Sequence, residues 1–331
     1  MTILKNNNVS LEDIREPIDV ELKNFDRFFK DAMRSNVGLI DLVTRYIIRQ
    51  KGKKVRPLLV LLSAKLCGSI TDKSYRAATL VELLHTATLV HDDVVDDADT
   101  RRGLASINAV WKNKVAVLMG DYLLSRGLLL SLEHKDYHFL HSTSNAVKRM
   151  SEGELLQIQK SRQLDIDEAT YYRIIGDKTA SLFSTCTDIG AASATDDDQR
   201  RKLMRDYGEN VGMAFQIQDD LLDYLGRKSI LGKPTGIDIK DKKLTLPLIY
   251  ALGNGPQKDS RQAMKRIRKG ASNKDIQWVL EFVRAAGGID YSINKARDFG
   301  SRAAANLATF ADSPVKQSLE RFVDFVLARS S

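Results

Sequence analysis

Proline is scarce in this chain of 331 residues, which contains six, and residues 58–233 contain none. The glycines within that stretch are scattered and do not recur at short intervals. A chain built from β-strands needs turn residues far more often than this. The sequence therefore predicts an all-α fold, with residues 1–331 in one helical domain and residues 1–15 as its loosely ordered start.

Cysteine and long apolar runs are scarce as well. Cys67 and Cys186 stand in apolar sequence without C-x-x-C spacing, so we expect reduced core residues in a cytoplasmic protein. Residues 1–8 contain no long apolar segment of the kind found in signal peptides. No stretch approaches the 18 uninterrupted apolar residues of a membrane span, and the sequence predicts no membrane anchor.

Negative charge is in the minority, with 43 Asp and Glu against 51 Lys and Arg, a net charge of +8. Much of the excess lies in three runs, at residues 51–56, 200–202 and 265–269. None of the runs is interleaved with aromatic residues, which a nucleic-acid stacking platform needs, so we expect no nucleic-acid partner. An anionic small molecule explains the first run better, and the other two are predicted to be solvated helix faces.

Two aspartate clusters are the most informative feature that the chain does contain. Both have the form DDxxD, at residues 92–96 and 219–223, and both lie in apolar, helix-favouring sequence. The first and last aspartates of each cluster fall one helical turn apart on one face, where they repel each other unless a cation lies between them. Carboxylates without a nearby His or Cys ligand pattern indicate a hard ion such as Mg²⁺.

A single DDxxD fits a solvated helix face equally well. Here apolar residues flank the acids on both sides, in the segments 85–96 and 213–223. Carboxylates at the edge of an apolar helix are costly to bury without a partner. A metal cluster resolves that conflict.

Basic residues near both clusters extend the pattern. Gly52-Lys53-Lys54-Val55-Arg56-Pro57 places cations just before a predicted helix, where backbone N–H groups also favour anions. Arg101 and Arg102 follow the first cluster, and Lys178-Thr179, Lys233 and Lys243 lie around the second. Each basic group alone is more often a surface feature, but acids for Mg²⁺ beside several Lys and Arg suit a diphosphate.

Over residues 51–250 the chain resembles the all-trans polyprenyl diphosphate synthases. The ordered motifs that carry the resemblance are Lys51-Gly-Lys-Lys-Val-Arg-Pro, the segment from His85 through Asp96 with Arg101-Arg102-Gly103, Gly120-Asp121, Gly153-Glu154, Lys178-Thr179, Phe215 to Asp223, Gly232-Lys233-Pro234 and Asp238 to Pro247. The resemblance implies an all-α isoprenoid synthase fold around a deep central cavity, usually as a homodimer.

The resemblance also implies a role for each matching residue. Metal ligands for Mg²⁺, three ions per active site in the family, would be Asp92, Asp96 and Asp219. The catalytic set adds Asp93, Asp220, Asp223, Lys178 and Lys233. Isopentenyl diphosphate would be bound by Gly52, Lys53, Arg56, His85 and Arg102. The allylic diphosphate, farnesyl or geranyl, would be bound by Arg101, Lys178, Thr179, Gln216, Lys233 and Lys243.

Three positions depart from the family pattern. Lys51 replaces a common glycine, and Lys54 replaces a common arginine, whose planar fork lysine lacks. Asp241-Lys242 replaces a frequent Glu-Gly, which leaves the choice between Lys242 and Lys243 open, although the register favours Lys243.

Small residues before the first cluster bear on product length. In short-chain relatives, aromatic residues at the positions of Ala87 and Thr88 close the cavity for the growing tail. The small side chains here indicate a product of about C30–C40, since one isoprene unit spans about one helical pitch. Alternatively, Met119, Leu123 or Leu124 forms a deeper floor. The expected product is a respiratory quinone side chain, destined for a membrane.

Four other functions remain open at this point. The nearest is a shorter-chain synthase with a C15–C20 product. A terpene cyclase usually keeps one DDxxD and lacks the second diphosphate site, and a non-catalytic partner subunit of a heteromeric synthase typically loses the aspartates. A basic nucleic-acid-binding protein is the most distant alternative.

Overall fold

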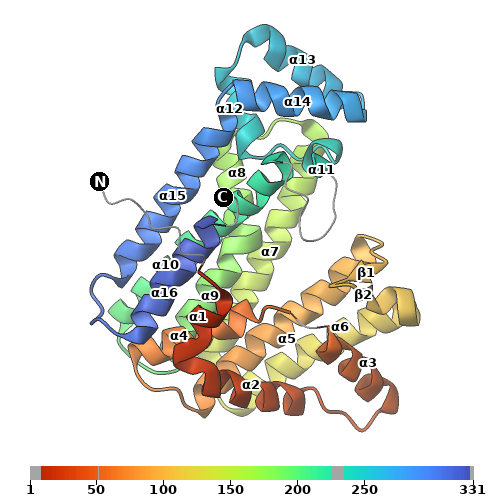
Figure 1. Cartoon of the computed structure of the whole chain (residues 1–331). Helices are drawn as coiled ribbons and strands as arrows, with labels where there is room; N and C mark the ends of the chain where they lie inside the picture. Colours follow the sequence, from red (N-terminus) through yellow and green to blue (C-terminus); the bar gives the residue numbers. More distant parts are fainter. Residues whose placement is uncertain (1–8, 51, 226–234, 329–331) are drawn as a thin grey trace. The chain divides into compact units, whose positions relative to one another are not determined.

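The structure, a computed structural model, describes residues 9–50, 52–225 and 235–328 and is almost entirely helical (Figure 1). Its contacts divide the chain into two compact units. The N-terminal unit comprises residues 15–144 and 185–204, and the C-terminal unit comprises the remaining described residues. The predicted all-α fold is confirmed. That residues 1–331 act as one domain stays a prediction.

The N-terminal unit is built around helix α5, Asp72–Val95, which packs against α4, Val55–Cys67, and α6, Ile107–Glu133. The Thr71 N–H donates to Ser74 Oγ (3.2 Å) at the start of α5. The N-terminal unit also contains η1 Glu16–Ile18, α2 Asp19–Ala32, α3 Gly38–Arg49, the start of α7 Tyr137–Gln163, the end of α9 Ser181–Ala192 and the start of α10 Asp198–Leu225. Every residue of the apolar segment 57–64 in α4 is buried.

A short hairpin follows α5, where the segment Arg101-Arg102-Gly103 alone predicts a loop. Strands β1, Thr100–Arg101, and β2, Leu104–Ala105, pair antiparallel, and Arg102 and Gly103 have φ angles of 53° and 79°. Two consecutive positive φ angles are typical of the tight turns that match the twist of paired strands. The hairpin brings Arg101 back toward the end of α5.

By length and composition alone, helix α6 is long and apolar enough to cross a membrane, and one such helix is weak evidence for a membrane span. About a third of its apolar window is buried. Gly120 and Gly127 permit close packing on α5, because a Cβ at Gly127 would lie 3.1 Å from Leu80 Cδ1. Arg126 Nε donates to the carbonyl of Ala32 (2.9 Å). Through these contacts, α6 packs on the core of the N-terminal unit.

The C-terminal unit contains α1 (Leu11–Arg15) up to residue 14 and those parts of α7, α9 and α10 that lie outside the N-terminal unit. It also contains eight further elements. These are α8 Glu168–Ile175, the π-helix η2 Gly176–Ala180, α11 Ile237–Lys240, α12 Leu246–Asn254, α13 Gln257–Arg268, α14 Asn273–Ala285, α15 Gly288–Leu307 and α16 Pro314–Leu327.

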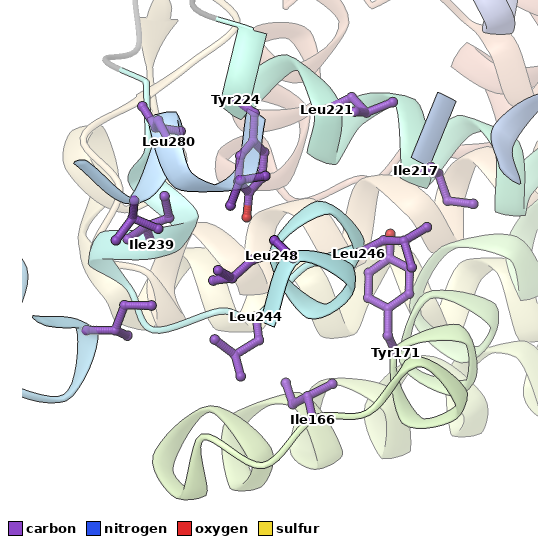
Figure 2. Packing of buried hydrophobic residues seen from close by; sticks show 14 of the residues in the cluster. Ile166, Tyr171, Ile217, Leu221, Tyr224, Ile239, Leu244, Leu246, Leu248 and Leu280 are labelled. Carbon is purple, nitrogen blue, oxygen red and sulfur yellow. The ribbon is translucent and has the colours of Figure 1, made fainter. Parts of the chain in front are cut away.

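The phase of α10 explains which of its residues reach the core of this unit. Each helical residue advances about 100°, so Ile217, Leu221 and Tyr224 share one face. All three are buried, and Figure 2 shows them directed into the apolar cluster that also holds Tyr171 and Leu246. The second aspartate cluster therefore lies along the border of a buried apolar face.

Part of the segment that was expected to be loosely ordered is helical. Residues 11–15 form α1, whereas a loose segment was expected. Ser10 Oγ accepts the N–H of Asp13 (3.2 Å), and Asp13 Oδ2 accepts the N–H of Ser10 (3.0 Å). This reciprocal cap is a helix-start signal that was readable in the sequence. Residues 226–236, whose glycine, lysine and proline predict a loop between two helices, lie mostly outside the described residues.

Candidate active site

The first aspartate cluster forms the last turn of α5. Asp92 and Asp96 are exposed, and the N–H of Asp96 donates to the carbonyl of Asp92 (2.8 Å). Asp93 points inward and is only 2% exposed. Two carboxylates are thus exposed one turn apart, as the helical period predicted, while the third has a different environment.

Asp93 holds Arg101 rather than facing solvent. Arg101 Nε and Nη2 donate to Asp93 Oδ1 at 2.8 and 2.5 Å, and Asn108 Nδ2 donates to the Asp93 carbonyl (3.1 Å). Because a guanidinium has five N–H donors, Arg101 retains donors for an anion. Asp93 therefore orients Arg101, and its part in catalysis stays a prediction.

A cavity of about 320 Å³ lies in the N-terminal unit, and Gly52, Lys54, Glu82, Arg101 and Arg102 are among its lining residues. Burial lowers the pKa of Arg56, and Glu82 opposes that shift. The Arg56 Nε is buried and has no hydrogen-bond partner among the described residues. An unsatisfied guanidinium donor is costly, so this region of α4 and α5 favours an anionic ligand.

His85 adds a neutral donor or acceptor to this region. Burial lowers its pKa well below the usual value, and Arg56, Arg102 and Arg101 lower it further. The imidazole is therefore uncharged at neutral pH. The structure brings together Arg56, His85 and Arg102, as predicted for the isopentenyl diphosphate site.

The two lysines before α4 differ in their partners. Lys54 has φ and ψ of 49° and 37°, and its Nζ lies 2.5 Å from Asp26 Oδ1. The carbonyl of Lys53 accepts from Arg15 Nη2 (3.1 Å), and the Lys53 side chain is exposed. Lys54 thus lines the cavity while its ammonium group is paired with a carboxylate.

The second cluster lies on α10, with Asp219 exposed and Asp220 buried. Tyr171 Oη and Gln216 Nε2 donate to the two Asp220 oxygens at 2.7 and 2.8 Å. Thr179 Oγ1 donates to Gln216 Oε1 (2.7 Å). Gln216 and Thr179 are therefore tied to the aspartate cluster by a continuous hydrogen-bond chain. Burial raises the pKa of Asp220 to about 8.

Asp223 connects this cluster to α11. Its Oδ1 accepts the N–H groups of Gly236 and Ile237, and its Oδ2 accepts that of Asp238, each at 3.0 Å. Burial, followed by the charge of Asp223, raises the pKa of Asp238 to about 6. Asp238 is a fourth acid that the sequence interpretation gave no role. Its signal was its place in the motif 238–247.

The ambiguity between two lysines has a geometric answer. Lys243 Nζ lies 3.6 Å from Asp241 Oδ2, and its charge lowers the pKa of Asp238. Lys242 has a φ of 59°, and its Nζ donates to the carbonyl of Arg268 (3.3 Å). Lys243 is therefore the one that faces the acidic cluster. Its contact with substrate stays a prediction, and Lys233 lies outside the described residues.

Lys178 lies on the π-helix η2, an irregularity that is frequent at functional sites. Its Nζ is 2.5 Å from Glu154 Oε2 and donates to Gln157 Oε1 (2.8 Å). Two glycines allow neighbouring helices to approach η2: a Cβ at Gly153 would lie 3.1 Å from Lys178 N, and one at Gly212 would lie 2.5 Å from Ala180 Cα. The Gly153-Glu154 motif thus positions Lys178.

The proposed chain-length residues share one buried cluster of α5 and α6. Ala87, Met119 and Leu123 belong to it, with exposed fractions of 2%, 3% and 0%. Thr88 is half-buried, and its hydroxyl donates to the His85 carbonyl (2.9 Å). Ala87, Met119 and Leu123 therefore pack in one cluster, and its effect on product length stays a prediction.

The exposed carboxylates of Asp92, Asp96 and Asp219 are the oxygen donors that Mg²⁺ prefers. Among the residues that the structure describes, no three His, Cys, Asp or Glu side chains are grouped to hold a metal ion. Asp92 and Asp96 belong to the N-terminal unit and Asp219 to the C-terminal unit. The donor chemistry fits Mg²⁺, and the predicted ligand set stays a prediction.

The buried Asp220 makes the stability of the metal-free protein depend on pH. Its pKa of about 8 lies above the ordinary 3.8, so its stabilising contribution is full below pH ~4 and is lost as the pH rises through ~8. We expect the unfolding temperature in EDTA to fall across that range and Asp220→Asn to flatten the fall. Calorimetry on both proteins checks this. Asp198→Asn, at an exposed position of α10, is the control, and a steep fall retained in Asp220→Asn would contradict the assignment.

Comparison with known proteins identifies the family. The polyprenyl synthetase family model matches residues 38–283. The chain belongs to the polyprenyl synthetase family. It is 35% identical over 319 residues to the all-trans-nonaprenyl-diphosphate synthase (geranyl-diphosphate specific) of Rhodobacter capsulatus, covering 96% of this chain and 98% of that protein. It is 34% identical to the octaprenyl diphosphate synthase of Escherichia coli, covering 94% and 96%.

Solved structures of this family have the same fold. The polyprenyl synthase of Caulobacter crescentus, crystallised with calcium and isoprenyl diphosphate, is 34% identical, with a TM-score of 0.88 over 98% of this chain and 100% of that chain. The decaprenyl diphosphate synthase of Rhodobacter capsulatus is 33% identical, with a TM-score of 0.90 over 97% and 100%. The resemblance found in the sequence is confirmed: this polyprenyl synthetase is a trans-prenyltransferase with the all-α isoprenoid synthase fold.

Proposed function

We propose that this prenyltransferase catalyses the Mg²⁺-dependent head-to-tail condensation of isopentenyl diphosphate with an allylic diphosphate. The observation that supports it most is the cationic region around the N-terminal unit's cavity, where the buried Arg56 Nε lacks a partner among the described residues and His85 is neutral. Arg56, Arg102 and His85 would hold the diphosphate of the non-allylic substrate. Lys53 and Gly52 would complete that site.

The allylic diphosphate would be bound by residues near both aspartate clusters. Bound Mg²⁺, held by Asp92, Asp96 and Asp219, would supply positive charge that stabilises the departing diphosphate. Arg101 and Lys178, each already oriented by a carboxylate, would donate to its remaining oxygens. Gln216, Thr179, Lys233 and Lys243 would complete this second site. The C–O bond would ionise, and the double bond of isopentenyl diphosphate would attack the resulting cation before a proton is lost.

The proposed product has about six to eight isoprene units and serves as a respiratory quinone side chain. The small Ala87 and Thr88 support a medium-to-long product, as do relatives named octaprenyl and nonaprenyl diphosphate synthase, whose names denote eight and nine units. A cytoplasmic homodimer that uses farnesyl or geranyl diphosphate completes the proposal.

Incubation with Mg²⁺, labelled isopentenyl diphosphate and farnesyl diphosphate tests the proposed reaction. We expect a ladder of products that ends near C30–C40 and is abolished by EDTA. A ladder that stops at C15–C20 would keep the reaction and reject the chain length. Absence of incorporation by folded protein would favour a partner subunit; one relative, from Bacillus subtilis, is named heptaprenyl diphosphate synthase component 2.

Gly52→Ala is expected to weaken isopentenyl diphosphate binding. A Cβ at Gly52 would lie 2.3 Å from Arg102 Nη1, which donates to the Gln50 carbonyl (3.2 Å). The flexible guanidinium must move, and loss of its charged hydrogen bonds should raise KM for this substrate about tenfold. Steady-state kinetics measure it, with Gly38→Ala as the control because nothing lies within 4 Å of a Cβ there. Equal KM values for both variants would remove Arg102 from the site.

Ala87→Tyr is expected to shorten the product. Tyrosine would enter the wall formed with Met119 and Leu123, where overpacking costs about 1–3 kcal/mol. The chain-length distribution checks this, with Val20→Tyr, at an exposed position, as the control for the substitution itself. The converse change, Met119→Ala, should lengthen the product. An unchanged distribution in both wall variants would show that the tail passes elsewhere.

A further inference from the structure

A second, open groove lies on the C-terminal unit, at the junction of α12 and α13. It encloses about 580 Å³ and is lined by Leu252, Ser260, Arg261, Met264, Lys265, Arg268 and Lys269. Helices α12, α13 and α14 lie together in this unit (Figure 1). None of the residues that line the groove is among those assigned to either diphosphate.

The four cations of the groove lie on one side of α13 and at its C-cap, and Lys258 lies on the same side outside the groove. Positions 258, 261, 265, 268 and 269 are all exposed, and the spacing of three and four residues places them along one side of the helix. In the described part of the chain, no ion pair involves any of these five residues, whereas the neighbouring Arg266 pairs with Asp275 and lies over Trp278. The opposite side of α13 buries Ala263 and Ile267.

The other residues that line the groove suit the uncharged part of an amphiphilic ligand. Leu252 and Met264 are partly buried members of the apolar packing layer and provide a non-polar floor. Ser260 Oγ is buried and has no hydrogen-bond partner among the described residues. A solvated helix face, which the sequence predicted here, has neither an apolar floor nor an unsatisfied hydroxyl.

We propose that the groove between α12 and α13 docks the enzyme on an anionic lipid bilayer, with lipid phosphates on the α13 cations and glycerol or upper acyl carbons over Leu252 and Met264. Charge complementarity selects this occupant: cations near an anionic membrane surface each raise partitioning about fivefold. The absence of stacking aromatics among the lining residues disfavours nucleic acid. A docked enzyme would release a long polyprenyl chain at the surface that must receive it.

Co-sedimentation of the full chain with sucrose-loaded vesicles tests this docking without reference to catalysis. We expect binding to phosphatidylcholine vesicles that contain about a third phosphatidylglycerol, no binding to pure phosphatidylcholine, and release at ~1 M salt. Arg261→Glu/Lys265→Glu should lower the partition coefficient about 25-fold or more, since two cations are lost and two anions are added. Lys23→Glu/Lys202→Glu, with the same change in net charge in the N-terminal unit, should retain most of the binding.

Two further arms identify what the groove binds. Met264→Gln removes the apolar contact but no charge, and its expected loss of about threefold distinguishes lipid insertion from charge alone. Inorganic phosphate at constant ionic strength should not compete. Any one of three results would overturn the proposal. These are an equal loss of vesicle binding in the two charge-reversal proteins, full competition by phosphate, and wild-type vesicle binding by Met264→Gln. Double-stranded DNA binding that Arg261→Glu/Lys265→Glu abolishes while vesicle binding persists would also overturn it.

Discussion

Asp219→Asn is expected to lower kcat by a factor of about a hundred to a thousand, because removal of one preorganised group that stabilises the departing diphosphate costs about that much. The exposed carboxylate on α10 would lose its charge, and with it a ligand for Mg²⁺. The KM for isopentenyl diphosphate should change little, since that substrate is assigned to Arg56, His85 and Arg102. Initial rates over a range of Mg²⁺ concentrations measure the effect.

Asp198→Asn is the matched control, since Asp198 begins the same helix and is exposed. It should keep wild-type kinetics. If Asp219→Asn kept more than about a tenth of the wild-type kcat, Asp219 would not be a metal ligand in the rate-determining ionisation.

Arg56→Gln is expected to raise KM for isopentenyl diphosphate by roughly two orders of magnitude, corresponding to about 3 kcal/mol for a desolvated charged contact. The substitution removes the buried guanidinium whose Nε has no partner among the described residues. It also removes the positive charge opposite Glu82, whose pKa is already raised by burial. The single variant should therefore lose stability as well as affinity.

A second variant separates these two effects. Arg56→Gln/Glu82→Gln removes both charges and should recover much of the lost unfolding temperature, while the KM stays high. Recovery of the KM together with stability would mean that Arg56 acts only through the fold. Glu82→Gln alone should not weaken isopentenyl diphosphate binding, because it takes a negative charge away from the cavity.

The two DDxxD clusters were predictable because a helical period is enough to place their first and last acids one turn apart. The helical period alone did not predict that the second aspartate of each cluster is buried. Asp93 faces inward to hold Arg101, and Asp220 is 8% exposed because it borders the face of Ile217 and Leu221. Counting the apolar neighbours on α10 could have predicted the second burial.

Other features depend on backbone geometry that the sequence signals weakly. The β1–β2 hairpin has only two residues in each strand, too few for a recognisable alternation. The π-helix at Lys178 arises where Gly153 and Gly212 allow close helix packing, which is a tertiary effect. The N–H of Asp238 donates to Asp223, although the two residues are 15 positions apart in the sequence. Helical periodicity does not predict a contact over that separation.

Binding of an unreactive allylic diphosphate analogue, measured by calorimetry with Mg²⁺ and with EDTA, tests the central claim most directly. That claim is that both aspartate clusters hold the metal ions of one diphosphate. The wild-type protein should bind the analogue at least about tenfold more tightly with Mg²⁺, and Asp92→Asn and Asp219→Asn should each lose that difference. A full Mg²⁺ effect in either variant would contradict the claim, because one cluster would then suffice.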